Sequence, residues 1–328
     1  YTDSSCPALL LEPQRTNLLP NSEYLGSSDW SKTAFGTGVV PVLTFGEESP
    51  EGLNNAYEIT FNTGAGTSSG DQSNMSESIG GQAAGDYTLS FWAKVSSGTD
   101  KIIARGAGGY LYTTCNLTTE WQRFEITENL ATAGSVYVDI GLRRGLANEP
   151  LNSSVTCQIY GIQLEAGSYA TSYIPTYGTS VTRSNETLSL GGMSSDVALG
   201  ATSGTLMVEF DYTQESLGDV IQWYSGNTIT GRGYLYNRSI GFADTWGSAG
   251  LGTTDGVNTK VIWRLDSLSS GTFFKDGVKG NDVSTTTQAW NNINTLYIRG
   301  YYGTLNIRQI IFVPYALTNE AAIDLTTL

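Results

Sequence analysis

Histidine is absent from this chain of 328 residues, and its absence excludes several kinds of site. Without imidazole the chain cannot assemble a Ser-His-Asp triad or a Cys-His pair, and it cannot bind zinc through histidine ligands. No remaining side chain has an ordinary pKa near neutrality with which to act as a general base. Carboxylate chemistry, which needs only Asp and Glu, stays open.

Charge is also scarce, and basic residues are the scarcer kind. Only 15% of the residues are charged, and 17 basic against 31 acidic residues give a formal net charge of −14. Nucleic acids are bound by basic stripes and patches, so this balance argues against a nucleic-acid partner. No uninterrupted apolar run approaches the roughly 18–20 residues of a membrane-spanning helix. We therefore expect neither nucleic-acid binding nor membrane insertion.

Cysteine is the third scarce residue type. The three cysteines, Cys6, Cys115 and Cys157, fit neither a disulfide framework nor a metal cluster. A single bridge between Cys115 and Cys157 stays open, and so does the redox compartment. Hydrophobic residues make up 39% of the chain, which is enough to form real cores.

Glycine and aromatic residues are plentiful, and apolar residues alternate with polar ones. The chain holds 39 Gly, 19 Tyr and 7 Trp, a composition that favours strands over helices. Between residues 87 and 95, for example, Leu89, Phe91 and Ala93 share one face while Trp92 lies on the other. The same period of two predicts strands over 87–95, 135–142, 206–212 and 260–266, and the doubly apolar stretch 305–313 reads as a central strand.

Turn and cap signals complete the expected fold. Asp276-Gly277 predicts a hairpin turn, and Thr318 is the expected N-cap of one short helical turn over 319–323. A small, polar segment near 183–195 marks a domain boundary, and each half has the size of one β-sandwich. We predict an all-β chain with two β-sandwich (jelly-roll) domains in tandem: a lead-in at 1–16, then domains at 17–183 and 184–328.

The first half resembles phage tail and virion surface proteins. The resemblance covers about residues 9–183 and is most specific in its closing stretch. The module is similar to carbohydrate-binding modules of the jelly-roll type, which implies a sugar-binding role. The residues that carry it are Leu9–Leu19, Asn21-Ser22, Trp30-Ser31-Lys32, Ser90–Lys94, Glu120–Arg123, Gln163–Thr176 and Val181-Thr182-Arg183.

The second half is more weakly similar to concanavalin-like lectin domains of the laminin-G type. The residues that carry this resemblance are Phe273–Gly277, Ile298-Arg299-Gly300 and the end from Ile307 to Leu325. Both resembled folds often hold structural calcium, so the resemblance implies calcium as the metal to consider. No Asp-x-Asp-x-Asp-Gly run locates such a site, and we expect no other cofactor.

Aromatic residues beside glycine-rich turns are the candidate carbohydrate-binding residues. Sugar C–H faces stack on tryptophan and tyrosine rings, while hydroxyl groups pair with short polar side chains. The alternative is that these rings belong to the core, because every sandwich buries two inner faces. The candidates are Trp92, Tyr110 and Tyr112 in the first domain and Trp223, Tyr234, Tyr236 and Trp246 in the second.

One strand raises the question of an enzyme. Glu209 and Asp211 project from the same face of the predicted strand, at a spacing that could hold two glycosidase carboxylates. Concanavalin-like glycoside hydrolases carry a further Glu two or three residues beyond the Asp, whereas Glu215 lies four beyond. A solvated outer face is the simpler interpretation, so we predict no catalytic residues.

The sequence therefore leads to three hypotheses. The first is a non-enzymatic virion or extracellular surface protein that attaches to cell-surface glycans as a homo-oligomer, since repeated copies add avidity to weak sites. The second is a structural decoration or filament subunit that binds only neighbouring proteins. The third, a polysaccharide-degrading enzyme, would depend on Glu209 and Asp211.

Overall fold

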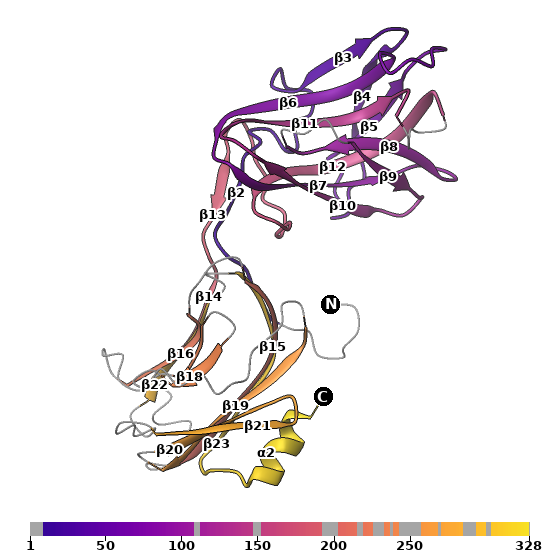
Figure 1. Cartoon of the computed structure of the whole chain (residues 1–328). Helices are drawn as coiled ribbons and strands as arrows, with labels where there is room; N and C mark the ends of the chain where they lie inside the picture. The colour runs from indigo at the N-terminus through magenta and orange to yellow at the C-terminus, as the bar shows by residue number, and fades with distance from the viewer. Residues whose placement is uncertain are drawn as a thin grey trace. The chain divides into compact units, whose positions relative to one another are not determined.

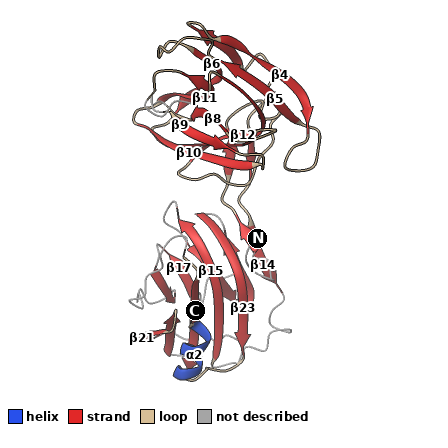
Figure 2. Ribbon diagram, turned by 90° about the vertical axis from the view of Figure 1, so that its right-hand side faces the viewer, coloured by secondary structure: helices blue, strands red, loops and turns tan. Residues whose placement is uncertain are grey.

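The chain forms two compact units built from strands. The computed structural model describes residues 9–107, 112–146, 152–191, 203–214, 219–225, 233–236, 239–242, 257–267, 270–284, 293–299 and 303–327. One unit is Arg15–Arg183, and the other combines Tyr1–Gln14 with Ser184–Leu328 (Figure 1). We call them the first and second unit. Within the described residues all regular elements are strands except one short helix, which confirms the predicted all-β class (Figure 2).

The first unit contains two five-stranded sheets that share one hydrophobic core. The β12 sheet has the order β10 (Gln122–Leu130), β7 (Gly85–Lys94), β12 (Ser154–Ala166), β5 (Ala56–Asn62), β4 (Val39–Glu47). The β6 sheet has the order β3 (Ser31–Phe35), β6 (Gln72–Gln82), β11 (Gly134–Arg143), β8 (Asp100–Arg105), β9 (Thr113–Leu117). Paired strands in both sheets run antiparallel.

Alternation along the strands builds this core. Leu89, Phe91 and Ala93 of β7 are fully buried, whereas Trp92 between them is half-buried on the outer face. In β11 the inward residues are again every second one, beginning at Val136. The predicted strands at 87–95 and 135–142 are therefore confirmed, and their burial follows from the period of two.

The second unit also has two sheets. One has the order β1 (Leu9–Leu11), β23 (Gly303–Val313), β15 (Gly204–Gln214), β19 (Thr259–Ser267), β20 (Ser270–Lys275), β21 (Val278–Ser284). The other has the order β14 (Thr187–Gly191), β22 (Ile293–Arg299), β16 (Asp219–Ser225), β17 (Gly233–Tyr236), β18 (Ser239–Phe242). Buried side chains from β15, β19, β20, β22 and β23 form a core, and Leu11 of β1 joins it.

Among the described residues, one short helix covers the other face of the six-stranded sheet. Helix α2 (Asn319–Thr326) buries Ala322 against Met207, Ile262 and Phe274. The predicted N-cap is confirmed, because the Thr318 hydroxyl accepts a hydrogen bond from the backbone N–H of Ala321 at 3.1 Å. No helix among the described residues is long and apolar enough to cross a membrane.

The predicted hairpin joins β20 to β21 in the second unit. Asp276 and Gly277 take φ values of 48° and 78°, the positive values that this turn requires. Asp276 is the one non-glycine residue with positive φ among those the structure describes. Asn and Asp tolerate this conformation best, which is why the Asp-Gly pair predicts the turn correctly.

The lead-in belongs to both units rather than forming a separate segment. Strand β1 pairs with β23, in the register Leu9↔Ile307. Strand β2 (Arg15–Asn17) pairs instead with β13 (Val181–Arg183) at the other end of the first unit. The first unit is therefore an insertion within the chain of the second unit.

The two described cysteines are free thiols. Cys115 and Cys157 lie buried in the core of the first unit without a disulfide, so the bridge left open by the sequence is not formed. Burial raises the pKa of Cys115 to about 12, which keeps this thiol protonated and unreactive at neutral pH. Cys6 lies outside the described residues.

Two fully buried polar side chains hold the closing segment of the first unit in place. Gln163 and Glu165 of β12 are both completely buried. Glu165 accepts hydrogen bonds from the Thr171 backbone N–H at 2.9 Å, the Thr171 hydroxyl at 2.5 Å and the Gln163 amide at 2.7 Å. Gln163 in turn accepts one from the backbone N–H of Ile174 at 2.6 Å. These bonds tie residues 171–174 to strand β12.

The opening segment is tied to the same place. The Asn17 amide donates to the Ile174 carbonyl at 2.9 Å and accepts from the backbone N–H of Leu164 at 3.1 Å. Ser22 and Thr176 bond reciprocally: the Ser22 N–H donates to the Thr176 hydroxyl at 2.9 Å, and the Thr176 N–H donates to the Ser22 hydroxyl at 2.8 Å. We call these contacts, with those of Gln163 and Glu165, the closing network.

The closing network gives a first prediction. Glu165→Ala leaves the Thr171 N–H and hydroxyl buried without this acceptor, and the Gln163 amide keeps only two longer contacts of 3.4 Å to backbone carbonyls, which costs roughly 3 kcal/mol of unfolding free energy. In urea denaturation of the full chain, the transition of the first unit should therefore move to a lower urea concentration. Glu125→Ala, at an exposed position of β10, is the control and should leave the midpoint unchanged. Equal midpoints for Glu165→Ala and the control would contradict the role of this network.

A buried carboxyl group gives a second prediction. Burial, with the nearby charge of Asp29 as a lesser cause, raises the pKa of Glu77 from 4.5 to about 7, and one of its carboxyl oxygens is buried without a hydrogen-bond partner. Since the folded pKa lies above the unfolded one, this group favours folding below pH 4.5, and that contribution disappears as the pH rises to 7.

The pH dependence can be measured by calorimetry on Glu77→Gln. This variant should gain on the order of 1–3 kcal/mol over the wild type at pH 8 and little at pH 4.5, because its amide never ionises. Glu125→Gln is the matched control and should follow the wild type at both pH values. A gain of the same size at both pH values would show that ionisation is not the cause.

Candidate functional site

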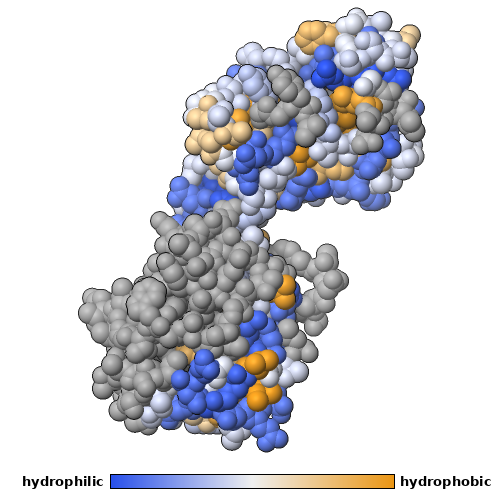
Figure 3. All heavy atoms as spheres, in the orientation of Figure 1, coloured by the Kyte–Doolittle hydropathy of each residue, from blue (hydrophilic) through white to orange (hydrophobic). Residues whose placement is uncertain are grey.

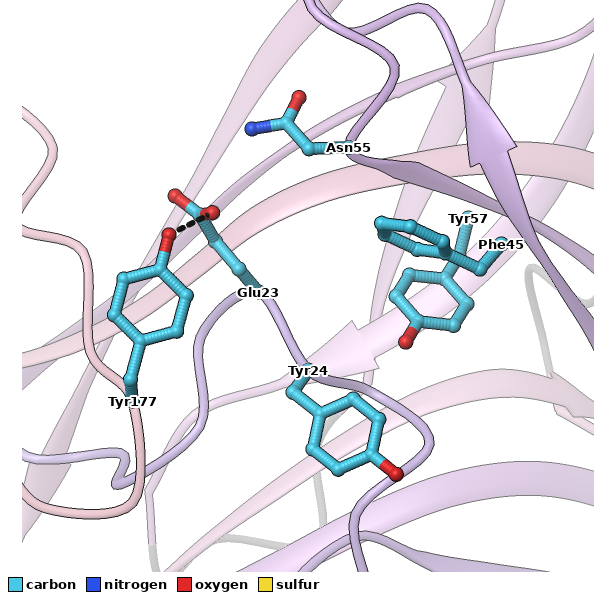
Figure 4. Close-up of a pocket in the computed structure, with 6 residues that line it drawn as sticks. All are labelled: Glu23, Tyr24, Phe45, Asn55, Tyr57 and Tyr177. Carbon is cyan, nitrogen blue, oxygen red and sulfur yellow. Dashed lines mark hydrogen bonds between the residues drawn. The ribbon is translucent and has the colours of Figure 1, made fainter.

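An aromatic pocket of about 470 Å³ opens on the first unit. Its volume falls within the range typical of small-molecule sites. Figure 4 shows Tyr177 on one side, Tyr24 below, and Phe45 with Tyr57 on the opposite side. The residues that line the pocket are Glu23, Tyr24, Phe45, Asn55, Tyr57 and Tyr177.

Three of the four rings are open to solvent. Tyr24 is 57% exposed, Phe45 59% and Tyr177 69%, whereas Tyr57 is buried. Phe45 and Tyr57 are directly paired across β4 and β5, and their ring centroids lie 5.0 Å apart at an interplanar angle of 57°. Large exposed apolar surfaces of this kind mark binding sites more often than structural ones.

Local sequence explains how the walls are positioned. Glu23 and Tyr24 come directly after Ser22, and Tyr177 comes directly after Thr176, so both segments leave the closing network at fixed points. Phe45 lies near the end of β4, and Tyr57 lies at the start of β5. Hydrogen-bonded backbone therefore supports every ring of the pocket, which limits the ordering that a ligand must impose.

Three tyrosine hydroxyls surround the Glu23 carboxylate. Tyr160 donates to it at 3.3 Å and Tyr173 at 3.2 Å, and Tyr177 donates to the other oxygen (Figure 4). Burial raises the pKa of Tyr160 and of Tyr173, and the hydrogen bond to Glu23 is the largest cause that raises the pKa of Tyr177 to about 12. All three therefore stay protonated and donate at neutral pH.

Trp92 supports this site but does not line the pocket. The Arg123 guanidinium lies over its ring at 4.7 Å, and the rings of Tyr160 and Tyr173 contact it at centroid distances of 6.0 and 5.8 Å. Gly161 forms a bulge with φ of 62°, where an added Cβ would come within 3.1 Å of the Trp92 ring. Trp92 is half-buried and contacts two of the three tyrosines that bind Glu23.

Tyr112 lies on the outer face of the β6 sheet, away from the pocket. Its hydroxyl donates to Asp139 at 3.0 Å, and the guanidinium groups of Arg105 and Arg143 lie 5.1 and 5.6 Å from its ring centre. Arg105 also forms an ion pair with Asp139 at 3.0 Å. The chain's own cations therefore occupy the surroundings of this ring.

The remaining predicted aromatics fall where the structure gives no side-chain description. Tyr110 and Trp246 lie outside the described residues. Trp223 belongs to β16, and Tyr234 and Tyr236 belong to β17, but only their backbone lies within the described part of the chain. Their proposed role in sugar binding stays a prediction.

The two candidate carboxylates of the second unit are hydrogen-bonded to neighbouring side chains. Glu209 accepts from the Asn258 amide at 2.9 Å. Asp211 accepts from the Asn306 amide at 2.7 Å and forms an ion pair with Arg308 at 3.2 Å. Both alternate with core residues of β15, so they lie on the face of the sheet opposite that core.

The described residues contain no group of three or more Asp, Glu or Cys side chains that could hold a metal ion. Calcium, implied by resemblance alone, is therefore not located by a carboxylate cluster in this part of the chain. The sequence pattern does not predict the pocket, because Tyr24 and Phe45 lie beside no glycine-rich turn of the kind that marks the predicted aromatic residues. Tyr24 lies close to the motif Asn21-Ser22, and Tyr177 directly follows the motif Gln163–Thr176. Their position beside these motifs is the sequence feature that indicates them.

Comparisons with known proteins do not assign the chain to a family. No protein-family model matches it, and no curated protein sequence does. The solved structures that are similar to parts or most of the chain include three with low TM-scores. One is NanB with Optactamide, with 16% identity over 42% of this chain and 25% of that chain, and a TM-score of 0.31.

The other two structures cover more of the chain. The N-terminal CBM22-1-CBM22-2 tandem domain of Paenibacillus barcinonensis Xyn10C has 9% identity over 93% of this chain and 99% of its own, with a TM-score of 0.32. Domains LG4-5 of the mouse laminin alpha1 chain have 9% identity over 72% of this chain and 86% of their own, with a TM-score of 0.21. This chain spans about a quarter of the NanB chain.

Proposed function

We propose that this chain is a non-enzymatic glycan-binding protein of a virion or other extracellular surface, and that it attaches through the aromatic pocket of its first unit. The observation that carries the proposal is the pocket of about 470 Å³ with four aromatic rings, one carboxylate and one amide. Sugars present C–H faces that stack on such rings and hydroxyl groups that bond to such polar groups. Weak single sites of this kind act through repeated copies, so attachment would use a homo-oligomer.

Two further features support binding without catalysis. The sequence offers no histidine, and Glu209 and Asp211 are engaged by amides and by Arg308. In the pocket Glu23 is the one titratable carboxylate, whereas glycoside hydrolysis ordinarily uses a pair of carboxyl groups that flank the bond. The virion part of the proposal is supported by the motifs that resemble phage tail and virion surface proteins.

The proposal predicts a specific loss of sugar binding. On a glycan array the intact protein should bind a defined set of glycans, and Tyr24→Ala or Tyr177→Ala should weaken binding about 3- to 10-fold, since each removes one stacking face. Tyr137→Ala is the matched control, because this tyrosine is exposed on β11 and does not line the pocket. Binding that is absent from the array, or unaffected by the pocket variants, would overturn the proposal.

A structural subunit that binds only protein neighbours is the second candidate, and strand β4 favours it. This strand is at the edge of the β12 sheet, and its residues Val39, Val40 and Val42 are exposed. Exposed edge strands with apolar side chains pair readily with another chain. Figure 3 shows such hydrophobic patches, in orange, scattered over a mostly hydrophilic or neutral described surface.

This second candidate predicts self-association through β4. The wild type should sediment as an oligomer, and Val42→Lys should shift it to the monomer because a charge then lies on the paired edge. Val278→Lys, at an exposed valine of the second unit, is the control and should keep the oligomer. A wild type that sediments as a monomer at high concentration would remove this candidate.

A further inference from the structure

The aromatic pocket carries negative charge and, among its lining residues, no positive charge. Glu23 lines it together with the neutral side chains of Tyr24, Phe45, Asn55, Tyr57 and Tyr177. The charge of Glu51 acts on the same region, since it contributes to the raised pKa values of Tyr160 and Tyr177. The electrostatic potential in the pocket therefore favours a cationic ligand and opposes an anionic one.

The hydrogen bonds to Glu23 leave its charge in place. Tyr160, Tyr173 and Tyr177 donate neutral hydroxyl groups, which satisfy lone pairs of the carboxylate without bringing a positive charge. No lysine or arginine of the described residues forms an ion pair with Glu23. An ionised carboxylate accepts at about four positions, so it can bind a further donor from a ligand.

The rings of the pocket differ from several other aromatic rings of the first unit, which have a cation of the chain over them. Elsewhere in the unit the chain's own cations cover aromatic rings: Arg15 lies 5.2 Å from Tyr169, Lys94 5.0 Å from Trp121, and Arg123 4.7 Å from Trp92. Within the described ranges, no arginine or lysine lies over Tyr24, Phe45, Tyr57 or Tyr177. The three exposed rings, Tyr24, Phe45 and Tyr177, are therefore open to a cation from outside the chain.

Aromatic rings beside a carboxylate form the type of site that binds organic ammonium ions. The face of each ring carries the negative part of its quadrupole, and the attraction to a cation strengthens as water is excluded. Here Tyr57 is buried, its ring lies 5.0 Å from that of Phe45, and Glu23 lies between Tyr177 and the Phe45–Tyr57 pair (Figure 4).

We propose that the pocket selects glycans through a cationic substituent, an alkylammonium group that lies against the rings of Tyr24, Phe45 and Tyr177 and pairs with Glu23. This inference rests on the proposed function, because it names the class of sugar that the same site takes. The group is either the primary ammonium of an amino sugar or the quaternary ammonium of a choline-type substituent. Uronic acids and sulfated sugars are repelled.

The test compares matched ligands with the full chain by isothermal titration calorimetry or ligand-observed NMR. Glucosamine and choline are the two cationic probes, glucose and N-acetylglucosamine the neutral ones, and glucuronic acid the anionic one. At least one cationic probe should bind about tenfold more tightly than the neutral sugars, a typical effect of a partly desolvated cation–π site, and glucuronic acid should bind least. Which cationic probe binds better distinguishes the two sources of the ammonium group.

Substitutions test whether the preference depends on the negative charge of Glu23 rather than on the shape of the pocket. Glu23→Gln should reduce the preference for the cationic probe to about twofold or less while neutral sugars still bind, since the amide keeps an acceptor oxygen but no charge. Glu125→Gln is the control and should keep the full preference. If Glu23→Gln lowers the melting temperature, Tyr24→Leu serves as the second variant, because it replaces an exposed ring without touching Glu23.

The outcomes distinguish this inference from the proposed function. Equal binding of glucosamine, N-acetylglucosamine and glucose, or an unchanged preference in both Glu23→Gln and Tyr24→Leu, would overturn the cationic selectivity and leave glycan binding standing. Failure of every sugar, here and on the array, would overturn both. A preference that weakens as salt is raised from low to high concentration, with neutral binding unchanged, would support the charge pairing.

Discussion

The fold of the first unit requires hydrogen-bond partners for two buried polar side chains that water cannot reach. Gln163 and Glu165 are completely buried, and a buried polar group without a partner costs about 1–3 kcal/mol. They are satisfied by backbone and side-chain groups of residues 171–174, so the closing segment can take only one path over β12. Because Asn17 bonds to both Leu164 and Ile174, the opening segment is fixed by the same requirement.

The hydrogen bonds of the closing network also fix where several pocket residues lie. Tyr177 follows Thr176, and Glu23 follows Ser22, at the point where those two residues bond to each other. Tyr173 precedes Ile174 in the closing segment, contacts the Trp92 ring and donates a hydrogen bond to Glu23. A buried hydrogen-bond network thus places the Glu23 carboxyl group beside the pocket, where a ligand can reach it.

The sequence predicts the features that depend on neighbouring residues, and it does not predict those that depend on residues far apart along the chain. Strands, the Asp276-Gly277 turn and the Thr318 cap follow from neighbouring residues, and they are predicted correctly. The pocket joins residues near 23, 45, 57 and 177, which meet only once the closing network has formed. For the same reason alternation places Trp92 on the outer face correctly, yet it gives no sign that Arg123 and Tyr173 cover the ring.

The lead-in shows how the entropic cost of pairing two strands far apart in the sequence can be reduced. Three leucines in succession have no period, so Leu9–Leu11 could not be assigned to a sheet, yet the strand pairs with β23 near the other end of the sequence. Closing a flexible loop of that length costs entropy that grows with the logarithm of its length. Pairing of Arg15 with Arg183 removes most of this loop, because the folded first unit brings Gln14 and Ser184 close together. The pairing of β2 with β13 thus shortens the loop that β1 must close to reach β23, which lowers the entropic cost of adding β1 to the six-stranded sheet.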